Sequence, residues 1–217
     1  MEPFDAVILA GGSGRRLGGV DKGGLVVAGL PLLDRVLQAS AAARRTVVVG
    51  ERRPTPRAVD WTREDPPGGG PLAGLEAGLA RLYVHPHGDH DGRDGGAQVG
   101  NPLGLGTASG TVVVLATDLP RLAPDDVVRL LAALSAEPQA DAALFSDPQG
   151  RPQPLAAAYR VGPIRAALAA VGPAHGKAVK LVLHQLAVVT VPDRGAAGDC
   201  DTPEQLAAAR AYYDRQG

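Results

Sequence analysis

Short runs of branched apolar residues alternate along this chain with segments rich in Ala and Leu, in which leucines recur three and four residues apart. The short runs are typical of buried strands, and the leucine spacing is typical of helices with one apolar face. Strands that alternate with helices usually form a parallel sheet joined by crossover helices. We therefore predict an α/β fold with a mostly parallel sheet.

The expected elements follow from this pattern. The predicted strands cover 6–10, 46–49, 111–116, 142–145, 155–159 and 187–191. The predicted helices begin at Pro31, Pro71, Pro124 and Pro203, with two more near 163–170 and 177–186. Proline suits the first turn of a helix, where its missing N–H would have no partner. The run 111–116 is continuously apolar, which predicts a central strand covered on both faces.

Composition and charge limit the class of protein. A chain of 217 residues with 45% hydrophobic content suits one globular domain, which we expect to span 1–217. A net charge of −1 gives no general attraction to nucleic acid. No apolar run approaches the roughly 20 residues that cross a membrane, and no signal peptide is evident. The single cysteine, Cys200, is typical of a reducing compartment, so we expect a cytoplasmic protein.

Residues 85–110 are rich in Gly, His and Asp without any periodicity. We expect a flexible surface insertion there. His85, His87 and His90 lie in this segment, but their spacing is not that of an ordered metal site.

The most informative segment directly follows the first predicted strand and has the sequence GGSGRRLGGVDKG, residues 11–23. Glycines allow a close approach of the backbone, so that successive N–H groups can converge on an anion. Arg15, Arg16 and Lys22 add positive charge. We predict a loop that binds more than one phosphate. The alternative is a flexible glycine-rich turn, but the two arginines and the Asp-Lys pair make this alternative less favoured.

This loop matches neither common phosphate-binding pattern. Leu17 stands where a dinucleotide-binding fingerprint has its third glycine, and Lys22 is not followed by Ser or Thr as in a P-loop. An NAD-dependent enzyme and a P-loop ATPase are therefore disfavoured.

Residues 9–23 resemble the signature of the molybdenum cofactor guanylyltransferases, in which Leu-Ala-Gly-Gly precedes Arg-Met-Gly-Gly-x-Asp-Lys-Gly. Leu17 replaces the usual Met, and the Asp before Lys22 favours this branch over the cytidylyltransferases. The resemblance implies a Rossmann-like nucleotidyltransferase fold of three α/β/α layers. It also implies Mg²⁺-dependent transfer of GMP from GTP to the molybdopterin cofactor, which yields molybdopterin guanine dinucleotide and pyrophosphate.

Two further segments extend the resemblance. Asp65 and the sequence Gly-Pro-Leu-Ala-Gly at 70–74 are similar to the family's guanine-binding motif, and the less favoured alternative is a Gly/Pro loop that leads into a core helix. Asp118 follows the central strand at its carboxyl end, where ligands bind in open parallel sheets. It resembles the family's metal-binding Asp, and the alternative is an Asp that caps the turn before Pro120.

Near the end of the chain, 199–206 resembles a family segment that lies close to the metal or the phosphates. Thr202 and Pro203 also have a structural explanation as a helix cap and a first-turn residue. The segment 151–159 corresponds to residues that line the pterin side in relatives. Gln153 replaces the family's His there, which leaves the pterin contact open.

Together, the resemblance assigns catalytic roles to Arg16, Lys22 and Asp118. It assigns nucleotide contacts to Leu9, Ala10, Gly11, Gly12, Ser13, Gly14, Arg15, Arg16, Lys22, Asp65, Gly70, Pro71, Leu72, Ala73, Gly74 and Asp118. Asp118 is the expected Mg²⁺ ligand, with Asp199 and Asp201 as further candidates. GTP and molybdopterin are the expected substrates, and molybdoenzymes or their chaperones are candidate partners. The alternatives are a cytidylyl or sugar-phosphate nucleotidyltransferase of the same fold, and a non-catalytic nucleotide-binding protein.

Overall fold

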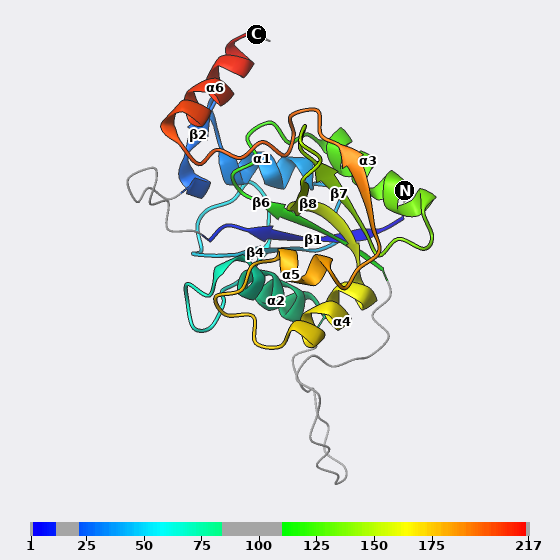
Figure 1. Cartoon of the computed structure of the whole chain (residues 1–217). Helices are drawn as coiled ribbons and strands as arrows, with labels where there is room; N and C mark the ends of the chain where they lie inside the picture. The colour runs from blue at the N-terminus through cyan, green and yellow to red at the C-terminus, as the bar shows by residue number, and fades with distance from the viewer. Residues whose placement is uncertain (1, 12–21, 84–109, 216–217) are drawn as a thin grey trace.

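A seven-stranded sheet forms the centre of the molecule, in a computed structural model that describes residues 2–11, 22–83 and 110–215 (Figure 1). The strand order is β5-β4-β1-β6-β8-β7-β9. The bounds are Phe4–Leu9 for β1, Thr46–Val49 for β4, Asp60–Thr62 for β5, Thr111–Ala116 for β6, Ala142–Ser146 for β7, Pro152–Arg160 for β8 and Val188–Pro192 for β9. Only β8 is antiparallel to its neighbours in this sheet. The prediction of an α/β fold with a mostly parallel sheet is confirmed.

Helices cover both faces of the sheet, as Figure 1 shows. One face carries α1 (Leu32–Ala39) and α3 (Pro124–Ala136). The other carries α2 (Gly70–Tyr83), α4 (Val161–Val171) and the short α5 (Lys180–Leu183). The structure thus has the three predicted α/β/α layers.

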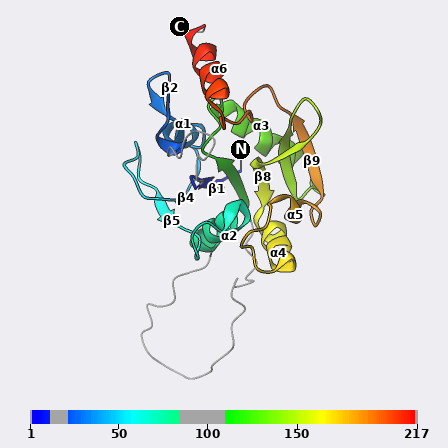
Figure 2. The same cartoon turned by 60° about the vertical axis from the view of Figure 1, so that its left-hand side comes forward.

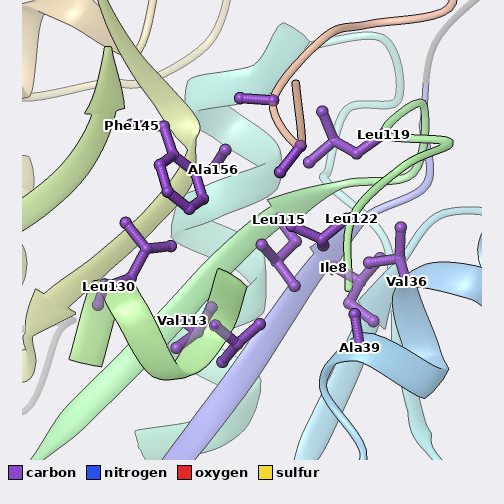
Figure 3. Close-up of a cluster of buried hydrophobic side chains, with 14 of the residues drawn as sticks. Ile8, Val36, Ala39, Val113, Leu115, Leu119, Leu122, Leu130, Phe145 and Ala156 are labelled. Carbon is purple, nitrogen blue, oxygen red and sulfur yellow. The ribbon is translucent and has the colours of Figure 1, made fainter. Parts of the chain in front are cut away.

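The central strands supply side chains to both layers, because successive residues of a strand point to opposite faces. Ile8 of β1 and Val113 and Leu115 of β6 belong to the cluster under α1 and α3, which Figure 3 shows. Val7 and Val114 belong to the cluster under α2. All five side chains are fully buried, which explains why β1 and β6 are continuously apolar in sequence.

The helix α2 lies very close to the sheet. A Cβ atom added at Gly78 would lie 2.5 Å from Cγ1 of Val7 and 3.1 Å from Cγ2 of Val49, so only glycine fits at this crossing. Gly70, the first residue of α2, has a φ of +84°, a conformation that glycine adopts without strain. Gly78 thus lets α2 pack directly on β1 and β4.

A small substructure packs against the C-terminal helix. A 3₁₀ helix, η2 (Lys22–Gly24), leads into a hairpin of β2 (Val26–Val27) and β3 (Leu30–Pro31). The hairpin contacts the C-terminal helix α6 (Pro203–Asp214), which projects away from the sheet (Figure 2). Buried side chains at Val27, Leu32, Cys200 and Ala209 pack together there. This packing brings the beginning of the hairpin close to the segment that precedes α6.

Several short elements differ from the predictions. The hairpin and β5 were not predicted, because strands of two or three residues show no recognisable periodicity. α5 covers only 180–183, so the prediction of a helix over 177–186 was too long. The predicted insertion at 85–110 lies outside the described residues, apart from Gly110. In the part of the chain that the structure describes, no helix is long and apolar enough to span a membrane.

Candidate active site

A cavity of about 470 Å³ opens where β1, β4 and β6 end. These strands are parallel, so their carboxyl ends meet at one edge of the sheet. The lining residues are Leu9, Gly11, Lys22, Val49, Glu64, Gly68, Gly70, Pro71, Gly74, Ala116, Thr117, Asp118, Leu119, Gln153, Pro154, Leu155, Ala156, Ala197 and Asp199. Apolar walls with a few polar and charged groups are typical of a ligand-binding cavity.

A lysine stands between two carboxylates at this cavity. Nζ of Lys22 donates a hydrogen bond to Oδ2 of Asp118 at 3.0 Å and a second one to Oδ1 of Asp201. The side chains of Lys22, Asp118 and Asp201 are 20%, 18% and 26% exposed, so the three groups are largely shielded from water. Burial disfavours the ammonium, but the hydrogen bonds and charges of Asp201 and Asp118 outweigh this effect and raise the pKa of Lys22. Lys22 is therefore a firmly charged group at neutral pH.

A third carboxylate, Asp199, also lines the cavity. Burial, together with the charges of Asp201 and Asp118, raises the pKa of Asp199. Nε2 of Gln205 donates a hydrogen bond to Oδ1 of Asp199 at 3.0 Å, which restrains this carboxylate.

Gln205 also caps the helix that follows. Its Oε1 accepts hydrogen bonds from the backbone N–H groups of Asp201 at 2.7 Å and of Thr202 at 2.9 Å. Its own N–H donates to Oγ1 of Thr202 at 3.3 Å, so the two residues form a capping box at the start of α6. Sequence reasoning did not assign Gln205 to the site, although the Thr-x-x-Gln spacing of a capping box is visible in the sequence.

The segment before α2 brings a different carboxylate to the cavity from the one expected. Glu64 lines the cavity, and its Oε1 accepts a hydrogen bond from the N–H of Gly68 at 3.2 Å. Asp65 is exposed and is not among the lining residues. The side chains of Leu72 and Ala73 are buried in the core beneath α2. Sequence reasoning missed Glu64, since adjacent acidic residues cannot be told apart by spacing alone.

The opposite wall of the cavity comes from β8, through residues 153–156. The hydroxyl of Tyr159 donates to the carbonyl of Pro154 at 2.8 Å, which fixes the start of this wall. Gln153 is the polar side chain here, in a wall that is otherwise formed by Pro and apolar residues. The cavity thus has an acidic end at Glu64, a charged middle at Lys22 and Asp118, and a largely apolar end at β8.

Comparison with known proteins decides the family. The sequence model of the MobA-like NTP transferase domain matches residues 6–188, from within β1 to the first residue of β9. The chain belongs to the MobA-like NTP transferase family. The resemblance on which the sequence analysis relied is therefore confirmed, and by family the chain is a nucleotidyltransferase.

Individual relatives of this MobA-like protein agree. The probable molybdenum cofactor guanylyltransferase of Deinococcus radiodurans is 32% identical over 73% of this chain and 68% of its own length. The molybdenum cofactor guanylyltransferase of Shewanella amazonensis is 28% identical over 94% of this chain and 93% of its own.

Solved structures show the same fold at low sequence identity. Molybdopterin-guanine dinucleotide biosynthesis protein A from Archaeoglobus fulgidus has a TM-score of 0.67 at 21% identity, covering 97% of this chain and 99% of that one. The 2-C-methyl-D-erythritol 4-phosphate cytidylyltransferase of Thermus thermophilus has a TM-score of 0.62 at 19% identity, covering 98% and 100%. The predicted Rossmann-like nucleotidyltransferase fold is confirmed.

The carboxylates of this MobA-like chain suit a magnesium ion held together with substrate. Mg²⁺ is usually bound through one or two carboxylates plus phosphate oxygens and water. Asp118 and Asp201 can reach one cation jointly, since both already contact the Lys22 ammonium. Within 2–11, 22–83 and 110–215, no three His, Cys, Asp or Glu residues form a ready-made metal group. The carboxylates of Asp118 and Asp201 fit the mode of binding in which one or two carboxylates and phosphate oxygens share the ion.

The structure brings together many of the residues that sequence reasoning selected. Those that line the cavity are Leu9, Gly11, Lys22, Gly70, Pro71, Gly74, Asp118 and Asp199. Those that do not are Ala10, Asp65, Leu72, Ala73 and Asp201, of which Asp201 still contacts Lys22. Gly12, Ser13, Gly14, Arg15 and Arg16 lie outside the described residues.

Proposed function

We propose that this chain transfers GMP from GTP to the terminal phosphate of the molybdopterin cofactor, with release of pyrophosphate. The observation that carries this proposal is the Lys22–Asp118 pair in the middle of a cavity whose two ends differ. Relatives named molybdenum cofactor guanylyltransferase support the choice of substrates.

The α2 end of the cavity suits the guanine base. Leu9 and Val49 offer apolar surface to a flat ring, and Gly70 and Gly74 leave room for it. A carboxylate can accept two hydrogen bonds from the adjacent N–H groups of guanine, and Glu64 is the carboxylate that lines this end. We assign the recognition of guanine to Glu64 rather than to Asp65.

The middle of the cavity suits the triphosphate. In the transfer, an oxygen of the acceptor phosphate forms a bond to the α-phosphorus of GTP, and the bond between that phosphorus and the α–β bridging oxygen breaks. The attacking phosphate is already an anion, so the protein's task is to align two anions and to neutralise developing charge. Lys22 would place its ammonium against the phosphates, and the loop residues Arg15 and Arg16 would add positive charge.

Asp118, with Asp201 and Asp199 beside it, would hold Mg²⁺. When bound, this ion supplies positive charge that offsets the negative charge of the phosphates. Gln205 would keep Asp199 turned toward the cavity through its amide hydrogen bond. The acceptor would lie along 153–156, where Gln153 can donate and accept hydrogen bonds with a heterocycle.

We further propose that 1–217 act as one nucleotidyltransferase domain in the cytoplasm, where the single cysteine would stay reduced. Molybdoenzymes or their chaperones would receive the product.

Pyrophosphate release tests this function. The purified protein is incubated with Mg²⁺ and with GTP, CTP, ATP or UTP, each with and without molybdopterin. We expect release with GTP that requires the pterin. Selectivity for CTP would instead indicate a cytidylyltransferase, and GTP binding without release would indicate a non-catalytic nucleotide-binding protein.

A further inference from the structure

The ammonium of Lys22 lies between two carboxylates, in a position that would also suit a metal cation. Its ammonium touches Oδ2 of Asp118 and Oδ1 of Asp201, which come from segments 96 and 179 residues away in sequence. Two carboxylates that contact the same ammonium lie close to each other, and they would repel each other without a positive charge between them. The protein's own ammonium supplies that charge.

In the proposed reaction Lys22 contacts phosphate and Asp118 binds metal, whereas in the structure these two side chains contact each other. The ammonium has three N–H donors, and Asp118 and Asp201 take two of them, so at most one is left for a phosphate oxygen while both carboxylates are held. An Mg²⁺ ion on the same carboxylate oxygens would lie close to the ammonium, and the two positive charges would repel each other. The ammonium and Mg²⁺ therefore compete for these carboxylates.

The fold gives Lys22 a fixed base and a movable end. Its backbone belongs to η2, directly before the hairpin that contacts α6. Val27 of this hairpin packs in one buried cluster with Leu32, Cys200 and Ala209. The flexible four-carbon stem of a lysine can swing its ammonium by several ångströms without backbone movement. The carboxylate of Asp118 lies at a strand end, and Asp201 is held through its backbone N–H by Gln205. The backbone of Asp201 is thus anchored, whereas the ammonium at the end of the Lys22 stem can move.

We propose that Lys22 is an internal substitute for the divalent cation in the nucleotide-free protein. The ammonium offsets part of the negative charge of Asp118 and Asp201 until a triphosphate draws it away, and the carboxylates then bind the metal more readily. Binding of metal without nucleotide is thereby suppressed, and metal and nucleotide bind together. This inference rests on the proposed function, because it assigns the carboxylates to a metal and the ammonium to phosphate.

The test measures Mn²⁺ binding to the full-length, nucleotide-free protein, by electron paramagnetic resonance of the free ion. Lys22→Met keeps the length of the side chain and removes its charge. We expect this variant to bind Mn²⁺ at least about ten-fold more tightly than the wild type, since a repelling cation is removed from the site. Lys22→Arg keeps the charge and should bind Mn²⁺ as weakly as the wild type.

Two further measurements locate the effect. The double variant Lys22→Met with Asp118→Asn should lose the gain in Mn²⁺ affinity, because a required carboxylate is missing. In thermal unfolding, Mn²⁺ should raise the Tm of Lys22→Met more than that of the wild type, since a ligand of the folded state stabilises it. Lys22→Gln takes the place of the Met variant if that variant does not fold.

Equal or weaker Mn²⁺ binding by a folded Lys22→Met or Lys22→Gln variant would overturn the inference, as would a gain that persists in the double variant. The measurement involves no turnover. A protein that transfers GMP but shows no gain in Lys22→Met refutes the inference alone, whereas a gain in a protein that transfers no GMP refutes the proposed function alone.

Discussion

Nζ of Lys22 lies 3.0 Å from Oδ2 of Asp118, although 96 residues separate them in the sequence. Lys22 follows the loop after β1, and Asp118 follows β6, the strand that pairs with β1 in parallel. Parallel pairing brings the two strand ends to the same edge of the sheet and so brings the two charges into contact.

Asp118→Asn tests the metal role of this carboxylate. An amide is a weaker Mg²⁺ ligand than a carboxylate, so we expect the Mg²⁺ concentration for half-maximal turnover to rise at least about ten-fold. A Mg²⁺ titration of pyrophosphate release measures it. Asp60→Asn changes a carboxylate of β5 that pairs with Arg81 and serves as the control. In this variant the Mg²⁺ concentration for half-maximal turnover should stay within about two-fold of the wild-type value. An unaltered titration in Asp118→Asn would remove Asp118 from the metal site.

Glu64→Gln and Asp65→Asn form a matched pair for base recognition. Loss of a charged acceptor for the guanine N–H groups costs about 1.5 to 3 kcal/mol, which corresponds to a rise of about ten- to a hundred-fold in KM for GTP. Asp65 is exposed and outside the cavity lining, so its variant should keep the wild-type KM. Steady-state kinetics with GTP and ATP distinguish the two. The opposite ranking would return guanine recognition to Asp65, as the family resemblance implies.

Gln205→Glu and Gln205→Ala separate two roles of one side chain. Glutamate keeps an oxygen for the N–H groups of Asp201 and Thr202, but it replaces the donor to Asp199 by a like charge. We expect Gln205→Glu to keep the Tm of the wild type. We expect it to raise the Mg²⁺ concentration for half-maximal turnover about ten-fold, as loss of an orienting partner weakens metal binding at other sites. Gln205→Ala should lower the Tm as well, by loss of the helix cap. A Gln205→Glu variant with an unchanged Mg²⁺ titration would limit Gln205 to its structural role.

Gly78→Ala and Gly74→Ala test how closely α2 approaches the sheet. A methyl group at Gly78 would lie 2.5 Å from Cγ1 of Val7, a fully buried side chain. The resulting overlap should lower the free energy of unfolding by about 1 to 3 kcal/mol. At Gly74 the new methyl would lie 3.4 Å from Cδ2 of Leu9, an ordinary contact, so stability should stay within about 1 kcal/mol of the wild type. Equal effects in thermal unfolding would contradict this packing.

Much of the fold could be predicted because β1 and β6 are buried on both faces and therefore stand out as continuous apolar runs. The position of Asp118 at the carboxyl end of a central strand followed from the same feature. The contact of Lys22 with Asp118 and Asp201 was not predicted, because it joins side chains 96 and 179 residues apart in the sequence. Glu64 could not be predicted, because whether it or Asp65 turns inward depends on the hydrogen bond to the N–H of Gly68. The hairpin of β2 and β3 could not be predicted, because its strands are too short to show a pattern and it contacts α6, which lies far along the chain.

The most direct test of the account follows the phosphorus atoms of GTP. The protein is given Mg²⁺, molybdopterin and GTP that carries a label either at the α-phosphate or at the γ-phosphate, and the products are separated. We expect the α-label to move into a molybdopterin guanine dinucleotide while the γ-label leaves in pyrophosphate, and we expect neither without the pterin. An α-label that appears only in free GMP or GDP, or that stays in GTP when molybdopterin is present, would contradict GMP transfer as the function of this chain.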